Sequence, residues 1–368
     1  MIRYIFICFI SIYSAVFGWG GEAHYLINQK SVYGFPGDSQ YLFSLQQVLA
    51  DHASDADARK GQDPTEAPKH YIDIDNYSYF TTYGYIPEDI DTLINMYGYN
   101  FVYDQGILPW AVVVAFDSLK ANFSRLNFEK AALIAADLGH YIGDASMPLH
   151  ITTNYNGQMT GQTGIHSRYE SKMISTYIDE ISYNTNYAVY INDVSEYVFD
   201  FIYYNYPYVD SLLAADLTAK ATSGGSYNST YYSKLWSLTK YFTTNLLRKS
   251  SSALASLIYT AWIDAGKPLP TDVKSEEFIA NSFELYQNYP NPFNPSTNIT
   301  FSVNNPSDVS IEIFNGIGEL VKHENFGFLG QGKYNYYFKA DSDMPSGIYI
   351  YKLTSNNNFK SNKMILVK

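Results

Sequence analysis

Cysteine is nearly absent from this chain. Its single cysteine, Cys8, lies in the first apolar segment. If that segment is removed, the remaining chain has no cysteine, which excludes disulfide bonds and thiolate metal ligands from the mature protein. Any metal ion would then have to be held by imidazole and carboxylate groups.

Basic residues are also scarce, with 24 Lys and Arg against 36 Asp and Glu and a net charge of -12. This excludes the basic surface of a typical nucleic-acid-binding protein, and an anionic substrate would need positive charge from another source. Beyond the first segment, no apolar run is long enough to cross a membrane. In contrast, hydrophobic residues reach 46%, enough for a sizeable core. The 37 Tyr and 22 Phe suit surfaces that meet lipid, glycan or protein.

The first 18 residues have the features of a signal peptide. A short positive start that includes Arg3 precedes an apolar stretch at residues 4–17, which is too short to span a bilayer. Val16 and Gly18 are small enough for the -3 and -1 positions of a cleavage site. The sequence therefore predicts a signal peptide at residues 1–18 and Trp19 as the mature N-terminus. The alternative is a buried first helix.

Residues 19–266 form the first predicted domain, which is all-α because apolar residues recur there at helical spacing and Pro is sparse. Its clearest helices are expected at residues 108–122, 128–142, 165–183, 194–213 and 234–247. A linker with Pro and mixed charge is expected at 267–282. Residues 19–280 contain 29 acidic and 16 basic residues, which gives a net charge of -13. Such an acidic domain attracts cations.

Residues 283–368 form the second predicted domain, an all-β sandwich. A cluster of Pro and Asn turns is followed by short segments whose apolar residues alternate. The predicted strands cover residues 299–303, 309–314, 334–340, 347–353 and 363–368. Seven acids and seven bases balance over residues 281–368, so the acidity belongs to the helical domain alone.

The segment HYIGDASMPLH carries the strongest chemical signal. His140 and Asp144 are four residues apart on a predicted helix, and this spacing places both side chains on one face. Pro148 should end the helix and return His150 towards the same side. His166 and Glu170 repeat the four-residue spacing on the next helix. A lone histidine is usually a buried core residue, but two such pairs and an intervening histidine favour a metal centre.

The N-terminal half supplies further candidate ligands. His24 lies five residues after Trp19, and Asp55 and His70 are 15 residues apart. For Asp73 and Asp75 we favour a solvated or supporting role. His52 and Asp57 have no clear geometric claim on the site.

The helical domain resembles the bacterial zinc-dependent phospholipase C family, on the stretch HYIGDASMPLHITTN at residues 140–154. That family shares its fold and trinuclear zinc site with fungal and plant single-strand-preferring nucleases. The chain departs from the family pattern at Thr152, where Pro or Ala is usual, and this position is not a ligand.

The resemblance implies three zinc ions. One ion would be held by Asp55, His70, His140 and the bridging carboxylate of Asp144. A close neighbour would be held by Asp144, His24 and the amine and carbonyl of Trp19. The third would be held by His150, His166 and Glu170. Since the free amine of Trp19 exists only after signal cleavage, this centre would be completed after export.

The implied reaction is phospholipid hydrolysis of the phospholipase C type, in which a zinc-activated hydroxide attacks phosphorus. Asp55 would orient or deprotonate the hydroxide, and contact with a membrane surface would be expected. The spacings at Asp55 and His24 look nuclease-like, whereas HSRYE, which ends at Glu170, looks phospholipase-like. A single-strand nuclease or 3′-nucleotidase therefore stays open as an alternative, as does a surface binding protein with structural zinc.

The C-terminal domain resembles the sorting domain of the type IX secretion pathway, on YPNPFNPSTNITFSV, IFNGIGELV, MPSGIYIYKL and KMILVK. The resemblance implies an immunoglobulin-like sandwich that the type IX secretion machinery reads. It also implies passage through the periplasm and a secreted or cell-surface protein. A carbohydrate-binding or spacer module of the same architecture is the alternative.

Overall fold

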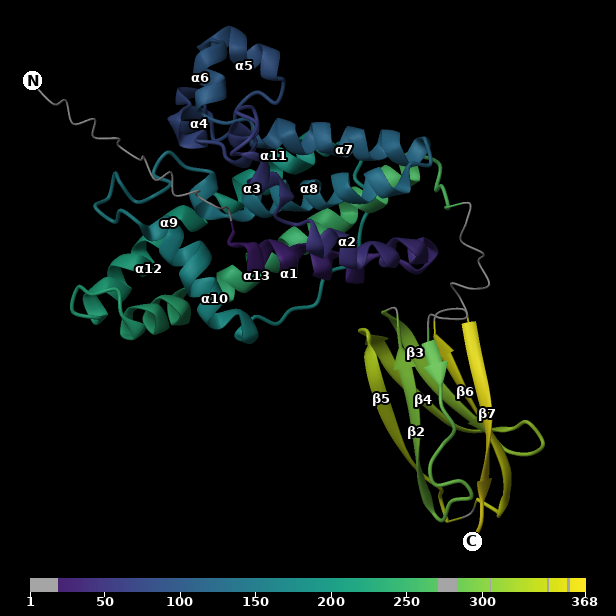
Figure 1. Cartoon of the computed structure of the whole chain (residues 1–368). Helices are drawn as coiled ribbons and strands as arrows, with labels where there is room; N and C mark the ends of the chain where they lie inside the picture. Colours follow the sequence, from purple (N-terminus) through teal and green to yellow (C-terminus); the bar gives the residue numbers. More distant parts are fainter. Residues whose placement is uncertain (1–18, 271–282, 305, 343, 356–357) are drawn as a thin grey trace, which may run out of the picture.

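The computed structural model describes residues 19–270, 283–304, 306–342, 344–355 and 358–368. The predicted signal peptide and residues 271–282 of the predicted linker lie outside them. The described chain has a helical part followed by a β part (Figure 1), which confirms the predicted fold class. None of the described helices has the length and hydropathy needed to span a bilayer.

The helical part contains long helices that surround the C-terminal half of α8. Its α-helices are α1 (Gly21–Ser31), α2 (Gln46–Asp51), α3 (Asp55–Arg59), α4 (Ser78–Tyr83), α5 (Ile90–Tyr97), α6 (Tyr99–Asp104), α7 (Leu108–Ser124), α8 (Phe128–Ser146), α9 (Ile165–Ser167), α10 (Ile174–Tyr177), α11 (Val194–Asn205), α12 (Tyr208–Thr222) and α13 (Ser229–Asp264).

Helix α8 is the centre of this part. It packs against α1, α2, α7, α11 and α13. Every residue from Leu138 to Ser146 is buried, so this half of the helix is enclosed on all sides. Towards the N-terminus of α8, the buried residues lie on one face of the helix and include Ala131, Ala135 and Leu138.

The predicted helices are observed with changes at three places. The range predicted at 194–213 is two helices, α11 and α12, separated at Pro207, because proline cannot continue the backbone hydrogen-bond ladder. The range predicted at 165–183 as one helix is divided into four pieces. These are α9, the π-helical turn Arg168–Met173, α10 and the short 3-10 helix Ile178–Glu180. The range predicted at 234–247 is one part of the 36-residue α13.

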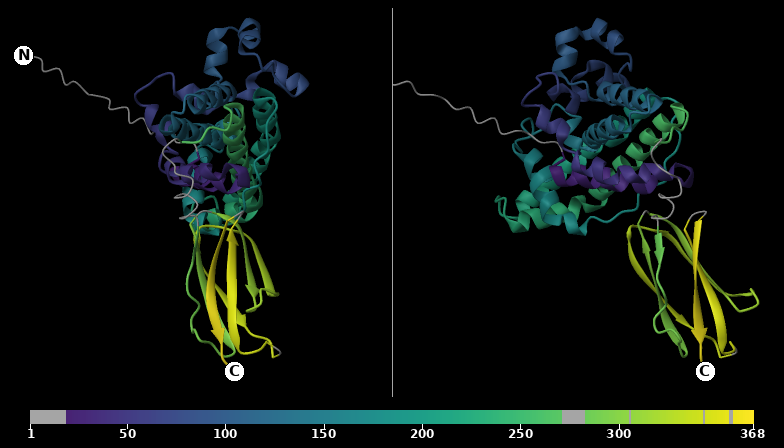
Figure 2. Two further views of the ribbon diagram at one scale, coloured as in Figure 1. Left: turned by 90° about the vertical axis from the view of Figure 1, so that its right-hand side faces the viewer. Right: turned by 45° about the vertical axis from the view of Figure 1, so that its right-hand side comes forward.

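A separate lobe is formed by residues 74–107, which contain the 3-10 helix Ile74–Asn76 and helices α4, α5 and α6. In Figures 1 and 2 these helices project from the rest of the helical part beside α7. We call this lobe the cap.

The β part contains two antiparallel sheets with the strand orders β1-β2-β5 and β4-β3-β6-β7. The strands are β1 (Phe283–Leu285), β2 (Ser296–Val303), β3 (Ser307–Phe314), β4 (Leu320–Leu329), β5 (Gly332–Lys339), β6 (Gly347–Ser355) and β7 (Asn358–Leu366). Alternate residues of both sheets, such as Phe301 and Tyr351, form a separate core. The five predicted strands are present, and β1 and β4 are additional.

Candidate metal centre

Two glycines in α8 allow α1 to approach it closely. A Cβ atom on Gly143 would lie 2.8 Å from Nδ1 of His24, and one on Gly139 would clash with Oδ1 of Asn28. No larger residue permits this packing. As a result the imidazole of His24 stacks on that of His140, with ring centroids 3.8 Å apart.

Asp144 is fully buried and faces four imidazoles. Its Oδ2 atom lies 2.9 Å from Nδ1 of His70 and 3.3 Å from Nε2 of His140. Its Oδ1 atom lies 3.1 Å from Nδ1 of His150 and 3.5 Å from Nε2 of His24. The predicted pair at 140 and 144 thus lies on one helix face, and Asp144 is positioned to bridge two groups of ligands.

Three groups of buried side chains among the described residues could hold a metal ion, and in each group the ligand atoms lie within 4.8 Å of one another. The groups are His24, Asp57 and His140; His70, His140 and Asp144; and His150, His166 and Glu170. The first two share His140, so they adjoin each other.

The third group lies where α8 has ended and the chain has turned back. Pro148–His150 is a 3-10 turn directly after α8, as the proline predicts. Nε2 of His166 lies 3.0 Å from Oε2 of Glu170 and 3.1 Å from Nε2 of His150. The π-helical turn that carries Glu170 is fixed by Arg168, which donates to Asp216.

Backbone carbonyls orient the imidazoles. Nδ1 of His140 lies 2.7 Å from the carbonyl of Ala53, Nδ1 of His150 lies 2.7 Å from that of His70, and Nδ1 of His166 lies 2.9 Å from that of Tyr155. When each Nδ1–H donates to its carbonyl, each Nε2 directs a lone pair towards the neighbouring ligands, as in histidines that bind metals.

These donors fit zinc. Two ligands of tetrahedral zinc, each about 2.0–2.1 Å from the ion, lie about 3.3 Å apart, close to the 3.1 Å between Nε2 of His150 and Nε2 of His166. Several buried atoms have no hydrogen-bond partner, including both ring nitrogens of His24, Oδ1 of Asp144 and Oε2 of Glu170. Buried polar atoms without partners are costly, and a bound cation would satisfy them.

The position predicted for Asp55 is wrong. Its side chain is 51% exposed and its Oδ2 lies 2.7 Å from Nδ1 of His52, so both residues lie at the surface. Asp57 takes the expected place, with Oδ1 3.5 Å from Nε2 of His140 and 3.6 Å from Nδ1 of His70. Two residues further along α3 turn the side chain to the other face of the helix.

Trp19 lies beside the third group. Its buried indole donates to Oγ of Ser146 at 3.1 Å and packs near Tyr169. The backbone N–H of Gly20 donates to the carbonyl of Glu170 at 3.3 Å. These contacts anchor the start of the described chain against the site. Ligation by the Trp19 amine and carbonyl stays a proposal.

Glu66 is a supporting residue that the sequence did not reveal. It is buried, accepts a hydrogen bond from the hydroxyl of Tyr141, and lies 3.6 Å from Nε2 of His70. A carboxylate at the far nitrogen orients a ligating imidazole. Asp75 has a supporting role too, because it accepts from Thr152 and Thr153, beside His150.

Opposing charges shift the ionisation of the buried groups. Burial would raise the pKa of Asp144, but His140 and His150 hold it well below its usual range. Burial would lower the pKa values of His140 and His150, but Asp144 raises both to about 10. Burial and the charge of His140 lower the pKa of His24 to about 4. A metal ion would therefore displace protons from His140 and His150.

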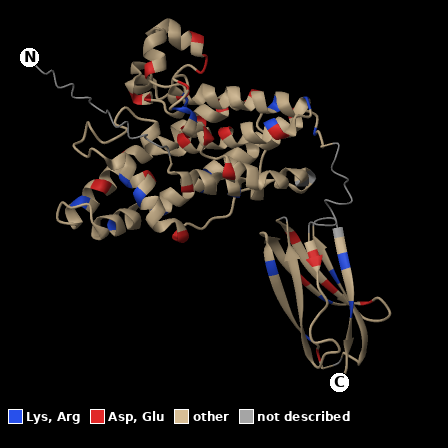
Figure 3. Cartoon of the chain, in the orientation of Figure 1, with Lys and Arg blue, Asp and Glu red and all other residues tan. Residues whose placement is uncertain are grey.

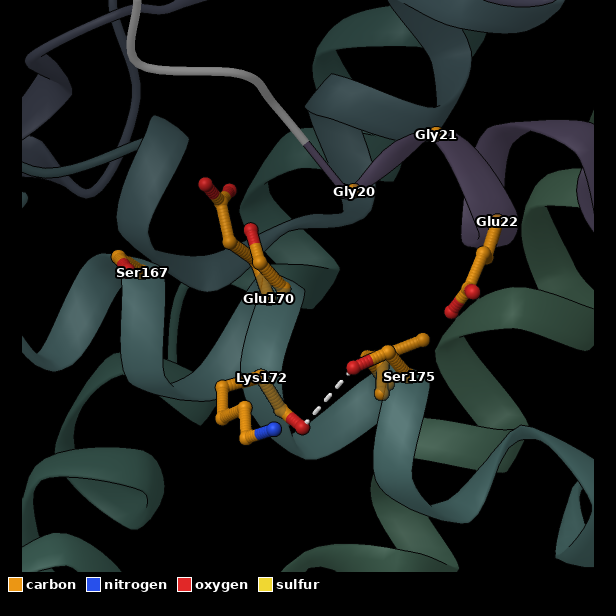
Figure 4. Close-up of a pocket in the computed structure, with 9 residues that line it drawn as sticks. Gly20, Gly21, Glu22, Ser167, Glu170, Lys172 and Ser175 are labelled. Atoms are coloured by element: carbon orange, nitrogen blue, oxygen red, sulfur yellow. Dashed lines mark hydrogen bonds between the residues drawn. The ribbon is translucent and has the colours of Figure 1, made fainter. Parts of the chain in front are cut away.

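A cavity of about 330 Å³ adjoins the site, lined by the start of α1 and the turn that carries Glu170. Figure 4 shows the carboxylate of Glu170 turned away from Lys172 and Ser175. The cavity therefore lies behind the third group rather than between its ligands.

We expect Gly143→Ala to displace His24. The added methyl group would meet the rigid imidazole at 2.8 Å, so α1 must shift and the group formed by His24, Asp57 and His140 opens. Zinc content, measured by atomic emission, should fall by about one ion per chain, with activity reduced about tenfold or more. Gly61→Ala is the control, because nothing lies within 4 Å of its Cβ. Equal zinc content in both variants would contradict this prediction.

Comparisons with known proteins identify the C-terminal part. Residues 287–368 match the family model described as "Secretion system C-terminal sorting domain". The protein therefore carries the signal for type IX secretion and is a secreted or cell-surface protein. No curated protein matches the chain.

Solved structures similar to this chain include two bacterial toxins. One is "Alpha Toxin from Clostridium Absonum", at 12% identity and a TM-score of 0.42. The other is alpha-toxin of Clostridium perfringens from an avian strain, at 13% identity and a TM-score of 0.38. Each match covers 95% of this chain and 98% of the other.

Proposed function

We propose that residues 19–266 form a secreted zinc-dependent phosphodiesterase of the phospholipase C type, joined through a linker at 267–282 to the sorting domain. The observation that carries the proposal is the carboxylate of Asp144, which faces four imidazoles between three adjoining groups of ligands. Structural zinc sites are normally single and closed. Adjoining groups are instead typical of centres that act on phosphate esters.

The ligand assignment follows the resemblance stated above, with Asp57 in place of Asp55. We propose His70, His140, Asp144 and Asp57 for one ion, and His24, Asp144 and the amine and carbonyl of Trp19 for its neighbour. The third ion would be held by His150, His166 and Glu170. When bound, zinc supplies a hydroxide at neutral pH and positive charge for the phosphate oxygens and the leaving group.

The protein's own residues orient this chemistry. The carbonyls of Ala53, His70 and Tyr155 hold three imidazoles with Nε2 inward, and Asp144 divides its two oxygens between the groups. Asp57 contacts two imidazoles and lies 2.6 Å from Nζ of Lys60. These contacts suit it to ligation rather than to proton transfer, so no base is assigned.

Charge favours a lipid over a nucleic acid substrate. Residues 19–280 have a net charge of -13, from 29 acids and 16 bases, and residues 71–119 contain no Lys or Arg. A nucleic acid chain presents many phosphates and is held mainly by Lys and Arg. A phospholipid presents one phosphate, which the metal ions could neutralise.

The test is hydrolysis by purified, zinc-replete protein of phosphatidylcholine in micelles and of single-stranded DNA, side by side. We expect release of phosphorylated head group, little DNA cleavage, and about three zinc ions per chain by atomic emission. One zinc ion or none in a fully active sample would contradict the trinuclear centre.

Glu170→Asp should separate the two substrate classes. The shorter side chain should draw the third ion away from its place beside His150 and His166, so lipid hydrolysis should fall while zinc at Asp144 stays. If the unaltered protein cuts DNA far faster than lipid, and Glu170→Asp leaves that rate intact, a nuclease takes the place of the phospholipase.

A further inference from the structure

The cap combines many aromatic residues with charge of one sign. Residues 74–107 contain seven of the chain's 37 tyrosines, five acids, and no Lys, Arg or His. In Figure 3, no Lys or Arg lies on α4, α5 or α6, and the charged residues of the cap are acidic. Neither feature is needed by the metal centre.

Large side chains of the cap face solvent. Tyr83 is 62% exposed and Tyr99 is 56% exposed, and Tyr85 and Met96 are also exposed. No residue of α4 is buried. Exposed aromatic residues gathered on one lobe mark a surface that meets another molecule.

The exposed rings lie against one another before any partner binds. The rings of Tyr83 and Tyr85 lie 4.6 and 5.3 Å from that of Tyr79, and Tyr99 stacks on Tyr103 at 4.2 Å. Beneath them, the hydroxyl of Tyr97 accepts a hydrogen bond from the backbone N–H of Tyr79. Since these contacts restrain the rings, little conformational entropy would be lost on binding.

Both ends of the cap are bonded to the segments that carry metal-ligand candidates. The N–H of Ile107 donates to the carbonyl of Pro68, two residues before His70. At the other end, Asp75 accepts from Thr152 and Thr153, beside His150. The cap is therefore attached at both ends to the segments that carry the candidate centre.

We propose that the cap docks the protein on membranes whose outer surface is rich in choline headgroups. The quaternary ammonium of choline is attracted to the faces of tyrosine rings and to carboxylates, and both are present together on the cap. Tyrosine is also suited to the membrane interface, with an apolar ring and a polar tip. Because the cap has no base, an anionic membrane would repel it. The proposal rests on the phospholipid substrate proposed above, although binding can be measured apart from hydrolysis.

The experiment measures co-sedimentation of the full-length, zinc-replete protein with vesicles of phosphatidylcholine or of phosphatidylglycerol, at low temperature and short times. We expect preferential binding to phosphatidylcholine. The variant Tyr83→Ser/Tyr85→Ser/Tyr99→Ser should lose at least about tenfold in vesicle binding. It should still hydrolyse a short-chain phosphatidylcholine present as soluble monomers at the original rate.

The matched control is Tyr187→Ser/Tyr190→Ser/Tyr241→Ser, which removes three tyrosines that are 58%, 46% and 89% exposed outside the cap. It should bind vesicles as the unaltered protein does. A second variant, Glu88→Lys/Asp91→Lys, keeps the rings and reverses the local charge. It should shift the preference towards phosphatidylglycerol.

Two results would overturn the docking proposal: unchanged binding of the cap variant, or tighter binding of the unaltered protein to phosphatidylglycerol. Failure of the proposed function looks different. In that case no phospholipid, soluble or in vesicles, would be hydrolysed, while binding through the cap would persist.

Discussion

We expect Asp57→Asn to lose one zinc ion per chain and to reduce hydrolysis about 100-fold or more. The amide has the shape of the carboxylate but no negative charge, so it would be a poor ligand between His70 and His140. Zinc content and turnover on phosphatidylcholine, measured on the same sample, check this outcome.

Asp55→Asn is the matched control, since the same change is made two residues away on the same helix. Its exposed side chain contacts only His52 among the imidazoles of the described residues, so zinc content and turnover should stay within about twofold. Lys60→Met removes the ion pair between Lys60 and Asp57. If Asp57 served only this ion pair, Lys60→Met would lower zinc content and turnover as much as Asp57→Asn does. The opposite ranking, with Asp55→Asn inactive and Asp57→Asn active, would restore the residue chosen from the sequence.

The confusion between Asp55 and Asp57 shows what the sequence could not supply. The segment ASDADARK has two aspartates with alanines beside them. Alanine occurs on both buried and exposed helix faces, so the sequence does not show which aspartate faces the interior. Ala56 is buried and Ala58 is exposed. The choice is made by packing of α3 against α8, which depends on residues far apart in the chain.

The segments around His140 and His166 were predictable because local rules decide them. A four-residue spacing on a helix places two side chains on one face, and Pro148 ends the helix whatever surrounds it. By contrast, the pairing of Glu66 with Tyr141 joins residues 75 positions apart and leaves no local pattern. The fold shows the same contrast between features set by local patterns and features set by long-range packing. Helical and alternating periodicity predicted both parts, whereas β4, in which no residue is buried, was missed.

Metal removal should have the largest effect on stability. Three sites, each saturated at about 1,000 times its dissociation constant, would stabilise the folded state by about 12 kcal/mol. For a domain of this size each kcal/mol shifts the midpoint of thermal unfolding by about 2–4 °C. We therefore expect chelation to lower the midpoint by about 20 °C or more, measured by circular dichroism. A shift of a few degrees would mean that the buried histidines do not hold zinc.

The sign of the pH dependence should also differ between the two forms. In the chelated protein, Asp144 raises the pKa values of His140 and His150 to about 10, above the unfolded value of about 6.5. The resulting stability is fully present below about pH 6.5 and is lost as the pH rises towards 10, by up to about 1.4 kcal/mol per pH unit for each proton. In the zinc-replete protein these imidazoles are already neutral. Its stability should instead be lost on acidification below about pH 6.5, because protons then compete with the metal.

Urea unfolding from pH 5 to pH 9.5, with and without chelator, measures both slopes. Asp144→Asn is the informative variant, since it removes the charge that raises both histidine pKa values while keeping the size of the side chain. In the chelated state it should flatten the loss of stability above pH 7. The same pH profile with and without chelator would show that metal and protons do not compete for His140 and His150, and that the buried cluster around Asp144 is an ion-paired core rather than a metal centre.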